Sequence, residues 1–137
     1  LALGEYLKRP GKDVLHAFIL GLEVECRIAN AVYATDNKRW FTNSTTGIFG
    51  AAAAAAKLLR LDEQQTAWAL GIAATQASGL REMFGTMCKP FHPGNAARNG
   101  LLAALLARTN FTSSNQAIEA PRGFANVLAT NVKERGV

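Results

Sequence analysis

The chain has 137 residues, of which 49% are hydrophobic and 18% charged, and its formal net charge is +5. This composition is unlike that of a disordered segment, and no apolar run reaches the ~18 residues that a membrane span needs. Aromatic residues make up only 8% and no basic stripe interleaves with them, so we expect a soluble protein that binds neither nucleic acid nor a membrane.

Helical signals run through the first half of the chain. Arg9-Pro10-Gly11 ends a short N-terminal helix, because proline cannot continue the hydrogen-bond ladder. Apolar residues then repeat every three or four positions from about Lys12 to Ala34, which predicts an amphipathic helix. A polar turn follows over residues 35–44, and the alanine-rich segment 45–61 predicts a buried helix.

The second half continues the helical pattern. Asp62 and Gln65 have the spacing of a capping box and predict a helix that runs to about Ala77. Residues 96–109 predict another helix, and residues 116–130 predict one or two short ones interrupted by proline and glycine. No segment predicts a strand. We therefore expect an all-α, multi-helix bundle that forms a single helical domain over residues 1–137.

The segment GTMCKPFHPGNAARNG, residues 85–100, gathers positive charge and helix breakers in one place. Pro93 suits the first turn of a helix, which would leave the N–H groups of Gly94 and Asn95 free to face a carboxylate or phosphate. Lys89 has apolar neighbours, and a partly desolvated ammonium gives up its proton more readily, as proton transfer requires. An exposed loop lysine is the equally simple alternative.

Other polar residues of this segment also allow two interpretations. His92 could bind a ligand or cap a helix. Arg98 could pair with a substrate carboxylate or with a buried carbonyl or acidic side chain. The two cysteines, Cys26 and Cys88, match no metal or disulfide spacing, so we predict inert thiols in a reducing compartment, and neither a metal site nor a cofactor.

A second polar cluster, WFTNSTTG, occupies residues 40–47. Hydroxyl groups at a helix start can accept hydrogen bonds from the unpaired N–H groups, or help to hold an anion there. Capping is the simpler interpretation for any one hydroxyl. Thr42 and Thr45 are the candidates for the anion.

The segment GTMCKPFHPGNAARNGLLAALLA, together with GIFGAAAAAAKLLRLDEQQTAWALGIAATQASGL and RGFA, resembles the MmgE/PrpD family across nearly the whole chain. The pattern G-T-x-x-K-P-x-H-x-G-x-A-A-R-x-G is long enough to be specific. The resemblance implies a helical domain beside a smaller α/β lid, with the active site between them. It also implies chemistry on di- and tricarboxylic acids without an obligatory metal, in which a proton next to a carboxylate is removed or moved.

The resemblance implies a lyase or isomerase, such as a 2-methylcitrate dehydratase, that works by general acid/base catalysis. Lys89 falls on the motif lysine and would be catalytic. The residues expected to bind the acid are Thr42, Thr45, His92, Gly94, Asn95 and Arg98. The resemblance further suggests a homodimer. The expected compartment is the cytoplasm, or the mitochondrion in a eukaryote.

Two departures from the family pattern qualify this assignment. Family members usually carry a histidine just before the Ser/Thr-rich helix start, where this chain has Phe41, and a phenylalanine ring neither donates nor accepts a proton. The chain is also much shorter than family enzymes and corresponds to an internal part of the helical domain without the lid. By itself it is expected to be inactive. The alternative to the enzyme is a non-catalytic helical fragment or pseudoenzyme that binds an acid or serves assembly only.

Overall fold

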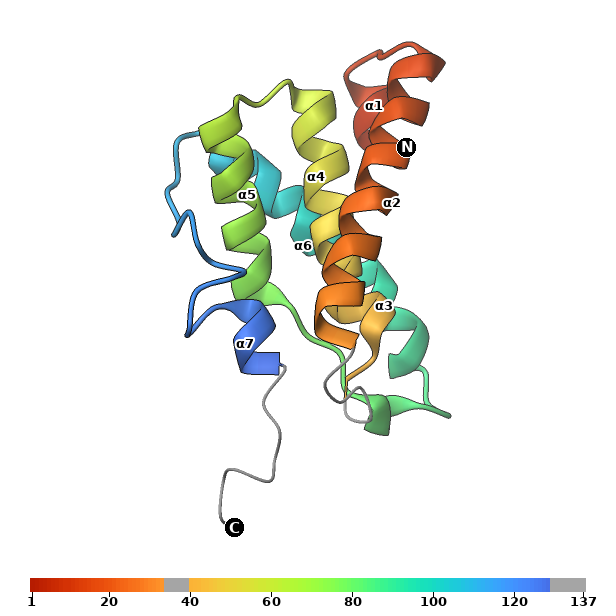
Figure 1. Ribbon diagram of the computed structural model, residues 1–137. Coiled ribbons are helices and arrows are strands. Elements are labelled where there is room, and N and C mark those ends of the chain that lie inside the picture. Colours follow the sequence, from red (N-terminus) through yellow and green to blue (C-terminus); the bar gives the residue numbers. More distant parts are fainter. Residues whose placement is uncertain (34–39, 129–137) are drawn as a thin grey trace.

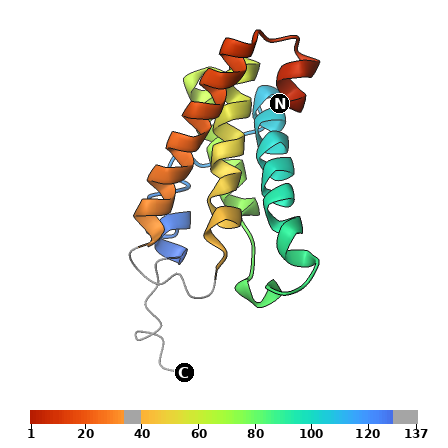
Figure 2. The same ribbon diagram turned by 90° about the vertical axis from the view of Figure 1, so that its right-hand side faces the viewer.

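The computed structural model describes residues 1–33 and 40–128, and these form a bundle of helices packed side by side (Figures 1 and 2). In chain order, the elements are α1 (Ala2–Tyr6), α2 (Gly11–Tyr33), α3 (Thr42–Thr45), α4 (Gly47–Leu59), α5 (Glu63–Gln76), the short 3-10 helix η1 (Arg81–Met83), α6 (Cys88–Arg108) and α7 (Phe124–Leu128). Within the described residues, the extended pairing consists of one isolated bridge between Trp40 and Leu80. The predicted all-α bundle is confirmed.

Local sequence signals placed several helix ends correctly. The predicted capping box is present at the start of α5: the N–H of Gln65 donates to Asp62 Oδ1 at 2.7 Å, and the N–H of Asp62 donates to Gln65 Oε1 at 3.4 Å. α4 ends where Arg60 adopts the left-handed conformation (φ 58°, ψ 42°). This geometry closes the last turn, as is common at helix C-termini.

Two predicted boundaries differ from the structure. α6 begins at Cys88 and not at Ala96, because Pro90 lies in its first turn, where the missing N–H is not needed. Residues 116–123 form turns, and the described part of the C-terminal segment contains only α7 as a helix. Part of the predicted polar turn over residues 35–44 is wrong, because residues 42–44 belong to the short helix α3. Residues 35–39 of that turn, and the predicted helical residues 34, 129 and 130, lie outside the described residues.

Helix α4 lies at the centre of the bundle and packs against α2, α5 and α6 (Figure 2). Its alanines are largely buried, as predicted for a helix that allows close neighbours. A Cβ atom added at Gly100 of α6 would lie 2.5 Å from the carbonyl oxygen of Ile48, and one at Gly21 of α2 would lie 2.6 Å from that of Gly50. Both contacts are with backbone, so glycine is required where α6 and α2 cross α4.

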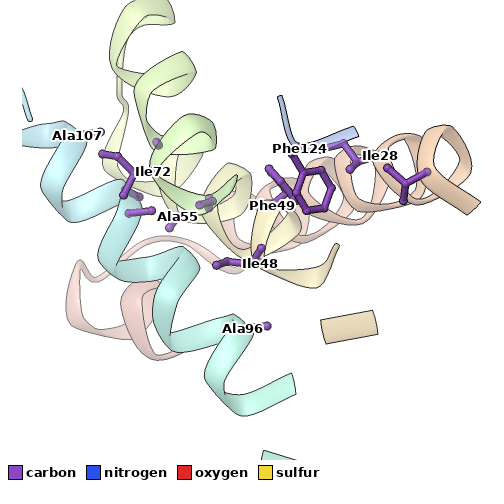
Figure 3. Close-up of a cluster of buried hydrophobic side chains, with 14 residues drawn as sticks. Ile28, Ile48, Phe49, Ala55, Ile72, Ala96, Ala107 and Phe124 are labelled. Atoms are coloured by element: carbon purple, nitrogen blue, oxygen red, sulfur yellow. The ribbon is translucent and has the colours of Figure 1, made fainter. Parts of the chain in front are cut away.

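The larger side chains of the core gather at one end of the buried cluster (Figure 3). The rings of Phe49 and Phe124 meet edge to face with their centroids 4.7 Å apart, near Ile28. The rest of the cluster consists mainly of alanine and isoleucine. Gly71 of α5 lies against the loop at Ser113.

Candidate functional site

At one end of the bundle, α3 meets two segments that come much later in the sequence: η1 with its flanking residues, and the first turns of α6 (Figure 1). The N–H of Phe41 donates to the carbonyl of Gly79 at 2.9 Å, which ties the start of α3 to the strand-like segment before η1. Lys89 and His92 extend from α6 beside these segments. We call the group formed by Phe41 and α3, residues 79–84, and residues 88–92 of α6 the α3/α6 site.

The expected free N–H groups at Gly94 and Asn95 are absent, because α6 begins six residues earlier. Both residues belong to the second turn of the helix, whereas only the first four N–H groups of a helix lack an intrahelical partner. At the true start of α6, the N–H of Cys88 donates to Thr86 Oγ1 and that of Lys89 to the Thr86 carbonyl, each at 3.2 Å. The predicted anion cradle at Gly94 is therefore wrong, and direct substrate contacts by Gly94 and Asn95 stay a prediction.

Lys89 is held by aromatic rings. Its Nζ lies 5.3 Å from the ring centroid of Phe41 and 5.9 Å from that of Phe84. The two rings meet edge to face, with centroids 5.3 Å apart and an interplanar angle of 88°. The lysine is exposed, so the expected partial desolvation is wrong for the described chain. An ammonium over ring faces is stabilised as a cation.

His92 is buried, with 7% of its surface exposed. Its Nε2 lies 3.9 Å from Cys88 Sγ, and its ring centroid lies 6.1 Å from that of Phe41. Nδ1 has no hydrogen-bond partner among the described residues. Such an atom is costly in a folded protein unless a ligand, water or another segment pairs with it. The ring therefore provides a polar atom available to a further group, as a ligand-binding role requires.

The hydroxyl groups of the 40–47 segment point to carbonyl oxygens. Thr45 Oγ1 and Thr46 Oγ1 donate to the carbonyl of Thr42 at 3.1 and 2.8 Å. Ser44 Oγ donates to the carbonyl of His92 at 3.3 Å, which links α3 to α6. Among the described residues no side chain caps α3 or α4, whose N-caps are Phe41 and Thr46, so the capping interpretation is wrong for Ser44, Thr45 and Thr46. They stabilise the turn, in the manner of back-bonded serine and threonine.

The structure brings together some of the predicted residues and separates others. Thr42, Lys89 and His92 lie in or beside the α3/α6 site. Thr45 also lines a groove of about 720 Å³ between α5, α7 and the loop at residues 111–117. Arg98 is exposed, and its Nε donates to Asn99 Oδ1 at 3.2 Å. Among the described residues, Arg98 pairs neither with a buried carbonyl nor with an acidic side chain, the two protein partners that were predicted for it.

Sequence reasoning missed two residues of the site, Phe84 and Gly79, and it did not indicate the contact of Ser44 with α6. Phe84 contacts Lys89 and Phe41 only through the fold, and no spacing could have indicated it. Gly79 has φ 130°, and a Cβ there would lie 2.7 Å from Ser44 and 3.6 Å from His92 Nδ1. The glycine is therefore needed for the segment to approach the site. In the sequence, Gly79 follows Ala77 and Ser78, and a Ser-Gly pair is only a weak signal for a turn.

The carboxyl group of Glu25 is partly buried. Glu25 of α2 faces the start of α4, where a Cβ at Gly50 would lie 3.1 Å from Glu25 Oε2. Burial raises the pKa of this carboxyl above its ordinary value. Among residues 1–33 and 40–128, no three His, Cys, Asp or Glu side chains are placed to hold a metal ion. No helix in the described ranges is long and apolar enough to cross a membrane.

Comparison with known proteins identifies relatives over the whole length of the chain. The sequence profile of the MmgE/PrpD N-terminal domain matches residues 1–135. A cis-aconitate decarboxylase of Homo sapiens is 39% identical over 134 residues, which cover 93% of this chain and 28% of the relative. A cis-aconitate decarboxylase of Aspergillus terreus is 39% identical over 143 residues, covering 98% of this chain and 29% of the relative. A cis-aconitate decarboxylase of Mus musculus is 35% identical over 130 residues, which cover 93% of this chain and 27% of the relative. The chain thus spans less than a third of these relatives.

Proposed function

The chain belongs to the MmgE/PrpD family, and from this premise we propose that it is the helical part of a lyase acting on a small di- or tricarboxylic acid. The relatives named cis-aconitate decarboxylase favour decarboxylation among the reactions that the family resemblance implies. The observation that carries the proposal is the placement of Lys89, an exposed cation over two aromatic rings beside the unpartnered Nδ1 of His92.

The proposed chemistry needs a cation next to the reacting carbon. In a decarboxylation, the bond from the carbon chain to a carboxylate breaks, CO₂ leaves, and the electron pair stays on carbon until a proton arrives. In a dehydration, a base removes a proton next to a carboxylate before hydroxide leaves. Negative charge develops beside a carboxylate in both cases, and a positioned ammonium stabilises it. We assign this role to Lys89, as a fixed cation and proton donor, and we assign to His92 a hydrogen bond to the acid.

The decisive experiment uses the full-length protein that carries this chain. It is incubated with cis-aconitate and, separately, with 2-methylcitrate, and the products are followed by proton NMR. Lys89→Ala is expected to lower kcat by about two orders of magnitude or more, the usual effect of removing one charge-stabilising donor. Arg108→Gln removes an exposed cation at the other end of α6 and is the matched control. An unchanged rate in Lys89→Ala would remove this lysine from the mechanism.

A non-catalytic protein is the second candidate, and Phe41 is the observation in its favour. The phenylalanine ring lies next to both Lys89 and His92 and cannot transfer a proton. Under this hypothesis, the full-length protein binds a polycarboxylate without turning it over, and Phe41→His gains activity. Robust turnover by the wild-type protein excludes this candidate.

We also propose that the full-length protein is a homodimer, as the family resemblance implies. Helix α2 exposes large apolar side chains on its outer face, namely Leu15, Phe18, Ile19 and Leu22. Such a face is typical of a surface that another segment or subunit covers. Light scattering on the full-length protein measures the mass directly, and a monomer at micromolar concentration contradicts this part of the proposal.

A further inference from the structure

A basic cavity lies at the opposite end of the bundle from the α3/α6 site. There the turn between α1 and α2 meets the C-terminal end of α4 (Figure 1). The cavity has a volume of about 500 Å³, within the range of small-molecule sites. Its lining consists of Arg9, Asp13, His16, Lys57, Leu58, Arg60 and Leu61. Thirteen residues of α4 separate the two ends, which is about 20 Å along the helix.

The charges around this cavity are unbalanced. Arg9, Lys57 and Arg60 carry permanent positive charges, and Asp13 is the one carboxylate in the lining. None of these cations lies within ion-pair distance of a carboxylate among the described residues. His16, on the facing side of α2, adds a fourth positive charge when protonated. The electrostatic potential in the cavity therefore favours an anion with more than one negative charge.

One of the cations is fixed in place by the fold. Arg9 donates from Nε and Nη2 to the carbonyl of Leu58 at 3.1 and 2.9 Å. The turn at the end of α4 leaves this carbonyl available, because the N–H of Arg60 donates to Lys57 and that of Leu61 to Ala56. The guanidinium is therefore held before any ligand arrives, and no residue in the described ranges accepts a hydrogen bond from its Nη1.

Capping of α4 explains part of this arrangement. Cations near a helix C-terminus are favourable, and Arg9 satisfies an otherwise unpaired carbonyl. However, the side chains of Lys57 and Arg60 donate to no carbonyl in the described part of the chain. A role as caps therefore accounts for Arg9 and leaves the other two cations unexplained.

We propose that this cavity binds a small phosphorylated molecule with at least two negative charges. Guanidinium groups pair with phosphate through two parallel hydrogen bonds, and a lysine supplies a compact charge beside them. A terminal phosphate offers three acceptor oxygens, which suits three cationic side chains around one cavity better than the two oxygens of a carboxylate. The site lies apart from Lys89, so this proposal does not depend on the proposed lyase activity.

The test uses inorganic pyrophosphate and the full-length protein in isothermal titration calorimetry at low ionic strength. The double variant Lys57→Gln/Arg60→Asn removes the two uncommitted cations, and asparagine tolerates the left-handed conformation at position 60. Its affinity for pyrophosphate is expected to fall at least about tenfold, because charge-assisted hydrogen bonds are lost. The control Arg27→Gln/Arg108→Gln removes the same charge from other surfaces and is expected to change the affinity less than about twofold.

The possible results separate the explanations. Failure of the wild-type protein to bind pyrophosphate at millimolar concentration overturns the proposal, as does an equal loss in the control. Citrate tests the other anion chemistry, and citrate binding as tight as that of pyrophosphate with the same dependence on Lys57 and Arg60 overturns the assignment to phosphate. Lys89→Ala is expected to bind pyrophosphate normally. If Lys89→Ala loses as much affinity for pyrophosphate as the double variant does, pyrophosphate occupies the α3/α6 site instead, and the proposal is overturned.

Discussion

The ammonium nitrogen of Lys89 lies 5.3 Å from the ring centroid of Phe41, at the position where the family resemblance predicts a histidine. The contact joins the start of α3 to the first turn of α6. A histidine at position 41 could exchange a proton with a substrate, whereas phenylalanine can only offer its ring face to a cation. Phe41 therefore offers a means of holding Lys89 but no proton carrier.

The aromatic contacts of Lys89 lead to the first prediction. Phe84→Leu removes one of the two rings that face the ammonium. We expect the affinity of the full-length protein for a non-reacting tricarboxylate, tricarballylate, to fall about two- to fivefold, since an exposed cation–π contact contributes about 0.5–1 kcal/mol. Calorimetric titration measures this change.

Phe111→Leu is the matched control for this prediction. Phe111 is similarly exposed, at 56% against 45% for Phe84, and it lies in a loop away from Lys89. Its replacement is expected to leave tricarballylate binding unchanged. Equal losses in both variants would mean that the rings act through general stability and not through the lysine.

The parts of the fold that local chemistry determines could be predicted from the sequence. The capping box at Asp62 and the buried alanine-rich helix α4 depend on residues within a few positions of each other. The start of α6 could not be placed in this way, because both Pro90 and Pro93 are compatible with a helix start, and the structure tolerates the second inside the helix.

The α3/α6 site was only partly predictable, for a different physical reason. Lys89 and His92 could be selected from the motif. Their surroundings depend on contacts between residues more than forty positions apart in sequence, such as that of Ser44 with the His92 carbonyl. From the local sequence, a hydrogen bond from the Ser44 hydroxyl to α6 cannot be distinguished from a cap on its own helix.

The second prediction concerns the close crossing of α4 and α6. Gly100→Ala places a Cβ within 2.5 Å of the Ile48 carbonyl oxygen, where backbone must move. Overpacking of this kind costs about 1–3 kcal/mol, more than the gain of up to about 1 kcal/mol from alanine in a helix. Gly94→Ala, on the same helix with nothing within 4 Å, should be neutral or stabilising. Urea denaturation distinguishes them, and similar effects in both variants would contradict the close approach of the two helices at Gly100.

The third prediction tests the cap of α5. Asp62→Ala removes the acceptor for the Gln65 N–H and is expected to lower the free energy of unfolding by about 1 kcal/mol. Asp62→Asn keeps an acceptor at the same position and is expected to retain most of this stability. The midpoint of urea denaturation reports both changes. If Asp62→Asn is as unstable as Asp62→Ala, the stabilisation comes from the charge of the carboxylate and not from the capping hydrogen bond.

The last prediction follows from Glu25, whose pKa is raised by burial against the start of α4. A raised pKa in the folded state means that folding favours the protonated carboxyl. Its contribution to stability is therefore complete below the unfolded pKa, about 4.3, and is lost as pH rises through the higher folded value. At pH 7, the ionised carboxylate opposes folding, although the nearby helix N-terminus attracts it.

Glu25→Gln is neutral at every pH and should remove this opposition. We expect its Tm to exceed that of the wild type at pH 7, and the difference to vanish when both proteins are melted below pH 4. Glu119→Gln makes the same change at an exposed position and is expected to leave Tm unaltered at either pH. A Tm advantage of Glu25→Gln that persists or grows at low pH would show that packing of the amide, and not loss of the buried charge, stabilises the variant.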